Sequence, residues 1–105
     1  GESVSIDKNE IVPQSFILYQ NYPNPFNPET NIKYYLQADG QVSLNIIDLN
    51  GKIVKEGYNG YKPAGYHIYR WGGINQEDEI MPSGIYVYKL AVNGYIQTGK
   101  MVLMK

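Results

Sequence analysis

Cysteine is absent from the 105-residue sequence, and histidine occurs once, as His67. Without a thiol the chain has no disulfide, thiolate nucleophile or sulfur-ligated zinc. A single histidine excludes a multi-histidine metal centre and a catalytic triad with a second base. No apolar run approaches the ~18 residues that a membrane-spanning helix requires. The sequence therefore predicts no enzyme, no cofactor and no direct membrane insertion.

The net charge and the alanine content of the chain are also low. The formal net charge is −1 and the pI is about 5.7, so no basic field indicates nucleic-acid binding. Alanine occurs three times, beside 11 tyrosines, 11 glycines and 6 prolines. Because tyrosine favours pleated strands whereas alanine is the best helix former, this composition predicts a turn-rich, all-β domain.

Short segments of alternating apolar and polar residues predict the strands. Asp39-Gly40, Asn50-Gly51 and Asn93-Gly94 are typical of tight hairpin turns. Short strands with turns every ~8–12 residues are the pattern of a two-sheet antiparallel sandwich. The best single core candidate is Trp71. We expect about seven strands, at residues 16–19, 32–36, 42–46, 53–58, 66–71, 86–92 and 95–104.

The first fifteen residues differ from the rest. Residues 1–15 are mixed and polar, and the chain opens without an initiator Met or a signal-peptide pattern. We expect a piece of a longer polypeptide, in which residues 1–15 are a linker from an upstream domain and 16–105 form the sandwich. The natural place for cleavage is the same linker.

Three prolines within six positions follow the first predicted strand. Asn24 and Asn27 each precede a proline, which favours an extended conformation at both asparagines. Proline donates no ladder hydrogen bond, so Pro23, Pro25 and Pro28 exclude a central strand. The segment 21–30 is therefore predicted to be a stiff, non-repetitive loop, and its central residues 22–28 are called the proline loop.

Three groups of residues raise the question of chemistry. The acidic run 77–79 allows calcium binding, but it lacks the alternating spacing of a calcium loop, and we favour a solvated loop tip. His67 allows a general base, but no nucleophile is indicated nearby, and we favour a packed or hydrogen-bonded side chain. Five aromatic residues could together form a platform on which sugars stack, although the core of a sandwich also needs aromatic side chains. These residues are Tyr58, Tyr61, Tyr66, Tyr69 and Trp71.

Several ordered sequence blocks carry a resemblance to a known family. The segment 18–32, LYQNYPNPFNPETNI, resembles the opening signature of the C-terminal sorting domains of type IX secretion substrates. The segments 42–54, 64–71 and 83–90 are similar to the family's inner strands, and KMVLMK at 100–105 is similar to its terminal motif. These domains are related to the Ig-like domain of the flagellar hook-capping protein. The resemblance therefore implies an all-β, Ig-like antiparallel sandwich.

The resemblance also implies a function. Such domains direct a larger secreted protein from the periplasm across the outer membrane, to the cell surface or the medium. The implied partners are the outer-membrane secretion machinery, a sortase-like peptidase and the upstream cargo. The C-terminal strand is open to strand addition by a receptor if it lies at a sheet edge. The residues expected to carry sorting are Pro23, Asn24, Pro25, Phe26, Asn27, Gly84, Tyr86, Lys100, Met101, Val102, Leu103 and Lys105.

Each of these residues also has a structural interpretation. Lys100 is equally well a charge that protects a strand edge from aggregation. Phe26 and its neighbouring prolines form a corner with the ring in the core, and Gly84 and Tyr86 are favoured as strand entry and core. Two other functions stay open: a carbohydrate-binding accessory module of a secreted glycoside hydrolase, and an Ig-like spacer or assembly domain.

Overall fold

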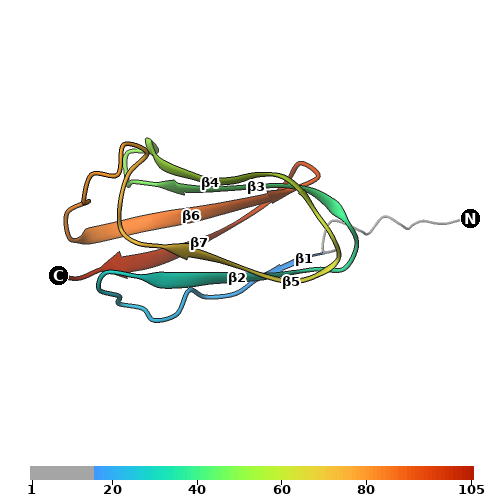
Figure 1. The fold of residues 1–105 in the computed structure, drawn as a ribbon, viewed down its shortest axis with the longest axis horizontal. Helices are drawn as coiled ribbons and strands as arrows, with labels where there is room; N and C mark the ends of the chain where they lie inside the picture. Colours follow the sequence, from blue (N-terminus) through green and yellow to red (C-terminus); the bar gives the residue numbers. More distant parts are fainter. Residues whose placement is uncertain (1–15) are drawn as a thin grey trace, which may run out of the picture.

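The computed structural model describes residues 16–105, so the predicted linker at 1–15 lies outside the described residues. These described residues form seven antiparallel strands in two facing sheets, as predicted (Figure 1). The sheet with the order β1-β2-β5 has three strands, and the sheet with the order β4-β3-β6-β7 has four. The strands are β1 (Phe16–Leu18), β2 (Thr30–Leu36), β3 (Gly40–Ile47), β4 (Ile53–Lys62), β5 (Gly65–Trp71), β6 (Gly84–Val92) and β7 (Tyr95–Leu103).

The core lies between the two sheets and is built from the alternating positions that the sequence pattern identified. Every second residue of β2, β3 and β6 points inward, and Trp71 at the end of β5 is 1% exposed. A sheet places successive side chains on opposite faces, so one inward face per strand suffices to fill the sandwich. The fully buried inward residues include Ile32, Leu36, Val42, Leu44, Ile46 and Leu90.

Two of the three predicted hairpins are confirmed. Gly51 and the Asn93-Gly94 pair have φ values of 84°, 51° and 88°, which are the left-handed conformations that tight hairpin turns require. The prediction for Asp39-Gly40 is wrong, because this segment joins β2 of one sheet to β3 of the other. There Asp39 Oδ1 accepts the backbone N–H of Ala64 at 2.8 Å, which ties this crossing to the return crossing between β4 and β5.

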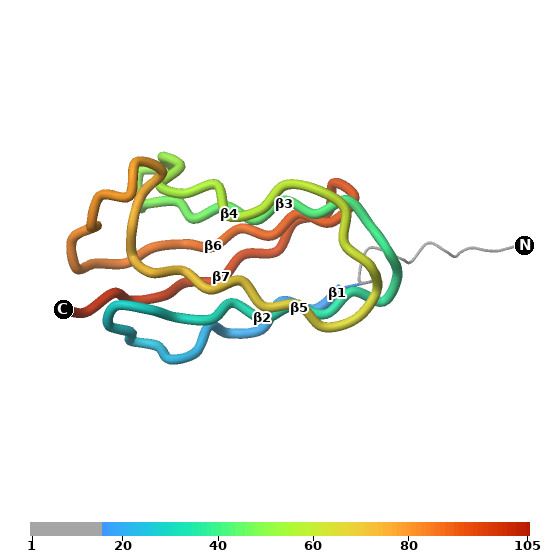
Figure 2. The backbone as a smooth tube through the Cα atoms, in the orientation of Figure 1, coloured from blue at the N-terminus to red at the C-terminus, as the bar shows by residue number. Residues whose placement is uncertain are grey.

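The topology places β7 at one edge of the four-stranded sheet. The proline loop, the C-terminal end of β7 and the long β5–β6 connection gather at the same end of the sandwich (Figure 2). Among residues 16–105 no helix is long and apolar enough to cross a membrane.

Candidate recognition site

The proline loop is closed at its base by two buried polar residues. Asn21 and Thr30 are 2% and 1% exposed, and Asn21 Nδ2 donates to Thr30 Oγ1 at 2.9 Å. Both side chains also donate to the carbonyl of Pro23, at 3.2 Å from Asn21 and 2.8 Å from Thr30. Buried polar groups that satisfy one another in this way fix the backbone around them. The loop is thus held in one shape while most of its residues stay exposed.

Tyr88 connects the start of this loop to the four-stranded sheet. Its hydroxyl donates to the carbonyl of Tyr19 at 3.0 Å and accepts the backbone N–H of Asn21 at 3.0 Å. The ring crosses directly over Gly99 of β7, where an added Cβ would lie 2.2 Å from the ring carbon Cζ. Burial raises the pKa of Tyr88, although the hydrogen bond from Asn21 acts in the opposite direction. The phenol therefore stays protonated and can donate to the carbonyl.

The far side of the proline loop is hydrogen-bonded to the last residues of β7. Phe26 N–H donates to the carbonyl of Val102 at 2.9 Å, and Met104 N–H donates to the carbonyl of Phe26 at 3.0 Å. Asn24 Oδ1 accepts the N–H of Val102 at 2.9 Å. Phe26 thereby forms a parallel bridge with Leu103. Two motifs more than 70 residues apart in the sequence form one continuous surface.

Phe26 anchors this surface in the core. Its side chain is 2% exposed, and its ring centroid lies 5.7 Å from that of Trp71. Trp71 in turn contacts Tyr86 edge-on at 5.3 Å, and the Tyr86 hydroxyl donates to the carbonyl of Pro82 at 2.7 Å. Burial, with a smaller contribution from the charge of Asp48, raises the pKa of Tyr86. The core interpretations of Phe26 and Tyr86 are confirmed.

The predicted sorting residues divide into an exposed and a buried set. Met101 and Leu103 are 0% and 1% exposed, so their side chains pack in the core. Val102 and Gly84 are half-buried. The exposed members are Pro23, Asn24, Pro25, Asn27, Lys100 and Lys105.

The edge of β7 is open along only part of its length. The outer backbone groups of Val102 are bonded to Asn24 and Phe26, so a receptor strand cannot pair there without displacing the proline loop. The Lys100 carbonyl accepts a hydrogen bond from Gln20 Nε2 at 2.9 Å. Alternate residues of an edge strand direct their backbone N–H and C=O groups away from the sheet. On β7 these groups are therefore free to pair with another strand only at Ile96 and Thr98. Strand addition at the terminal block, expected from sequence, is therefore blocked in this structure.

The other candidates from the sequence form no catalytic or metal arrangement. His67 Nε2 lies 2.7 Å from the carbonyl of Pro63, so this nitrogen carries the proton and donates. In the acidic run 77–79 the backbone N–H groups of Glu77 and Glu79 donate to Asn75 Oδ1 at 2.9 Å, which forms a compact turn. Within the described part of the chain, no three acidic, histidine or cysteine residues group as a metal site.

The five aromatic residues proposed as a sugar platform do not share a surface. Trp71 is buried, and Tyr58 and Tyr69 pack against the core. Burial raises the pKa of Tyr69, as expected for an inward phenol. Only Tyr61 and Tyr66 are exposed, at 66% and 63%, and they lie on different sheets. These five residues therefore form no common platform, because Tyr69 and Trp71 are on the inward-facing side of β5.

Sequence reasoning missed the residues that position the proline loop, namely Asn21, Thr30, Tyr88 and Gly99. A polar pair flanking a proline run, and a glycine inside an otherwise regular strand, are the available signals. Glycine in a strand interior often marks a close approach, here by the Tyr88 ring. Neither signal indicates which residue the polar pair or the glycine contacts.

Solved structures with a similar fold include proteins from two bacteria. Dimeric latent PorU from Porphyromonas gingivalis superposes with a TM-score of 0.72 and 18% identity, over 95% of this chain and 10% of that one. PorZ of the same organism, described as an essential surface component of the type-IX secretion system, gives 0.58 and 21%, over 84% and 11%. The DNA glycosylase AlkC of Pseudomonas fluorescens, bound to DNA with an abasic site analogue, gives 0.51 and 14%, over 87% and 31%. At these identities the likeness shows the fold alone, and this chain spans about a tenth of the length of the first two.

The protein is thus an antiparallel β-sandwich, and its candidate site is the proline loop packed against the edge of β7. A family model described as the secretion system C-terminal sorting domain matches residues 20–104, and the chain belongs to this family. It is a C-terminal sorting domain of the type IX secretion system, the secretion signal of a larger secreted protein, and the family is non-catalytic. Proteins sorted in this way cross the outer membrane and are secreted or held at the cell surface. No curated protein that was compared matches this chain.

Proposed function

We propose that the secretion machinery recognises a composite surface, made of the proline loop and residues 100–105. The observation that carries this proposal is the set of hydrogen bonds joining Phe26 to Val102 and Met104, and Asn24 to Val102. A receptor that meets folded cargo needs a rigid exposed feature. A loop held at its base by Asn21 and bonded to a strand along its far side meets that need.

The exposed residues of this surface are the ones we assign to direct contact. Asn24 and Asn27 offer amide groups, and Lys100 and Lys105 offer positive charge. The backbone N–H of Lys105 donates to Ser83 Oγ at 3.1 Å, which holds the chain end beside the entry to β6. The buried members of the predicted set act as the frame, and their loss is expected to change recognition through folding: Phe26, Tyr86, Met101 and Leu103.

The finer assignments follow from the family rather than from a contact seen here. The specific partners in this proposal are the outer-membrane machinery and a sortase-like peptidase. Residues 1–15 would join the sandwich to an upstream cargo domain and would contain the cleavage site, and 16–105 would be the sorting unit.

An export assay tests the proposal. Residues 16–105 are fused to a passenger in a bacterium with an active type IX system, and the passenger is measured in the periplasm and outside the cell. We expect export of the unaltered fusion and periplasmic retention of a Lys100→Gln, Lys105→Gln variant. Lys89→Gln is the matched control, because Lys89 is exposed at the centre of the same sheet, away from the proline loop.

The outcomes separate the competing functions. Normal export of the double lysine variant contradicts the recognition role of these lysines. Export at the normal level accompanied by aggregation of the purified variant assigns Lys100 to edge protection instead. Failure of the unaltered fusion to leave the cell favours a spacer domain.

A further inference from the structure

The outer face of the three-stranded sheet carries a compact group of aromatic and basic side chains. Pairing of β1 with β2 and of β2 with β5 brings nine outward positions into three rows, extended beyond β1 by the contacts of Tyr19 with Lys33 and of Tyr22 with Asn31. We call this surface the tyrosine face. Its rows are Ile17, Tyr35 and Tyr66; Tyr19, Lys33 and Ile68; and Tyr22, Asn31 and Arg70.

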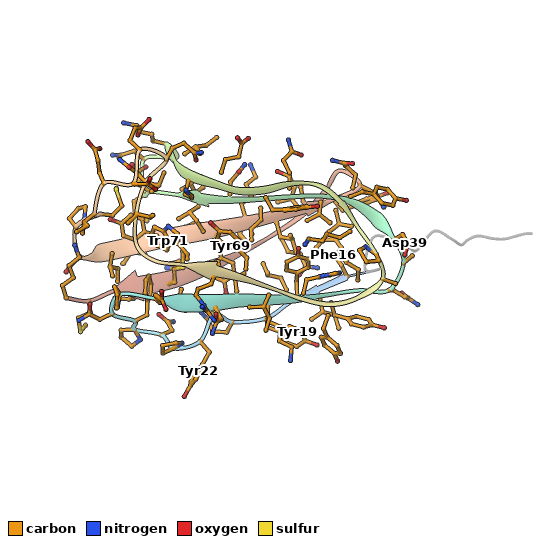
Figure 3. All side chains as sticks on the ribbon, in the orientation of Figure 1. Phe16, Tyr19, Tyr22, Asp39, Tyr69 and Trp71 are labelled. Atoms are coloured by element: carbon orange, nitrogen blue, oxygen red, sulfur yellow. The ribbon has the colours of Figure 1, made fainter. Side chains whose placement is uncertain are left out.

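The rings of the tyrosine face contact one another instead of standing singly. The centroid of the Tyr66 ring lies 4.8 Å from that of Tyr35 and 6.5 Å from that of Tyr19. Lys33 Nζ lies 4.7 Å from the Tyr66 centroid and 5.2 Å from the Tyr19 centroid, within cation–π range of both. Figure 3 shows Tyr19 and Tyr22 on the outer side of β2, directed away from the sandwich.

These side chains remain accessible although they cluster. Tyr22 and Tyr66 are 78% and 63% exposed, and Ile17 and Ile68 are 48% and 64% exposed. Six of the nine positions are tyrosine or isoleucine, two are basic, and none is acidic. Lys33 lies at the centre of this group, and Asn31 and Arg70 lie at one end of it. A contiguous exposed group of aromatic and aliphatic side chains of this kind marks a binding site.

The outer face of the four-stranded sheet provides an internal comparison. Its outward positions on β3, β6 and β7 carry no aromatic residue, and β4 adds a single exposed tyrosine, Tyr61. They are mainly small, aliphatic or polar, such as Ser43, Ala91 and Thr98. The concentration of rings on one face is therefore a local property and does not follow from the high tyrosine content alone.

We propose that the tyrosine face binds an acidic polysaccharide, a function beyond the sorting role. The flat phenol rings offer stacking surfaces to sugar rings, their hydroxyls can hydrogen-bond to sugar hydroxyls, and Lys33 and Arg70 pair with the carboxylate, sulfate or phosphate groups of the polymer. The nine positions include two basic residues and no acidic one, so the charge of the face is complementary to that of an acidic polymer.

Two other partners fit the same face less well. A stable protein interface takes ~20–30 residues on each side, whereas this face has nine positions. Recognition of an anionic membrane usually relies on clusters of ~4–8 basic residues, whereas this face has two, Lys33 and Arg70. An extended polymer requires only a narrow platform, which the three strands provide.

Affinity electrophoresis of the 105-residue chain tests the proposal. The gels contain polygalacturonate, heparin or the neutral glucan pullulan, and vesicles of phosphatidylglycerol are tested in parallel by sedimentation. We expect retardation by at least one acidic polymer and none by pullulan. Tyr66→Ala should weaken this binding by about fivefold or more, and Lys33→Gln should reduce its dependence on salt.

The matched control is Tyr61→Ala, which removes a tyrosine of similar exposure, 66%, from the other sheet. Near-ultraviolet circular dichroism shows that each variant is folded. The proposal is overturned if no acidic polymer retards the chain, if pullulan retards it equally, or if Tyr61→Ala and Tyr66→Ala weaken binding alike. Binding to vesicles alone, lost in Tyr66→Ala, would assign the face to a membrane surface and also overturn it.

Discussion

Substituting Gly99 by alanine should disturb the proline loop, although the two are separated by most of the chain. An added Cβ would lie 2.2 Å from Cζ and 2.3 Å from the hydroxyl oxygen of Tyr88. An ordinary van der Waals contact begins at 3.4 Å, so the ring must retreat by more than 1 Å. Its hydroxyl then leaves the 3.0 Å contacts with Asn21 and Tyr19.

The expected loss of stability combines two effects. Forcing one extra carbon into a packed site costs ~1–3 kcal/mol. Leaving buried hydrogen-bonding groups unpaired costs a further ~1–3 kcal/mol. Alanine is favoured over glycine within a strand by ~0.5–1 kcal/mol, which offsets part of this. We therefore expect Gly99→Ala to lower the free energy of unfolding by about 2–4 kcal/mol, a large share of the ~5–15 kcal/mol that is typical of a domain.

A double-mutant cycle in urea measures this effect and identifies its cause. In a Tyr88→Leu background the shorter side chain leaves room for the Cβ, so Gly99→Ala should become neutral or slightly stabilising. A coupling free energy above about 1.5 kcal/mol is expected between the two positions. Gly72→Ala is the control, because nothing lies within 4 Å of its Cβ position. A coupling near zero, or an equal loss from Gly72→Ala, would contradict a steric clash between the added Cβ and the Tyr88 ring.

Three further predictions concern the loop, the strand edge and alkaline pH. Phe26→Ala should lower the free energy of unfolding in urea by about 3–5 kcal/mol, because the ring is 2% exposed. The Tyr22 side chain is 78% exposed, so Tyr22→Ala should change this free energy by less than about 0.5 kcal/mol; similar losses in the two variants would contradict the role of Phe26 as a buried anchor. The amide proton of Val102 should exchange with deuterium more slowly than that of Thr98, since the proline loop covers only the former; equal rates would contradict the docking. Burial raises the pKa of Tyr34 from 10.0 to about 12, so its neutral form stabilises the fold fully below pH 10, and this contribution is lost as the pH rises towards 12. Urea midpoints should be flat from about pH 8 to about pH 10 and then fall; a rise in stability above pH 10 would contradict the sign.

The strands could be predicted because their information is local. Alternation in β2, β3 and β6 assigned the buried face of each strand, and the structure confirms it. Asn50-Gly51 and Asn93-Gly94 determine hairpins through residues that accept positive φ. Asp39-Gly40 has the same composition signal, but the Asp39 side chain bonds to Ala64, and the segment crosses between sheets. Turn chemistry alone does not say which strand pairs with which.

The candidate site was only partly predictable for the same reason. The proline loop and the terminal block were each recognised as motifs, but the bonds between Phe26 and β7 are long-range backbone contacts that leave no pattern in the sequence. The meeting of Tyr19 with Tyr66 likewise requires the strand order β1-β2-β5. The alternation of side chains along β5 could have shown that Tyr66 lies on the opposite face from Tyr69 and Trp71, because successive residues of a strand point to opposite faces of the sheet.

Site-specific photo-crosslinking in exporting cells tests most directly whether the proline loop and the chain end are read as one surface. A photoreactive residue is placed at Asn27, at Lys105 or, as a control, at Lys89, in a passenger fusion that is still exported. We expect the probes at Asn27 and Lys105 to capture the same component of the secretion machinery and the probe at Lys89 to capture none. Capture of different components at Asn27 and Lys105, or equal capture at Lys89, would contradict this expectation.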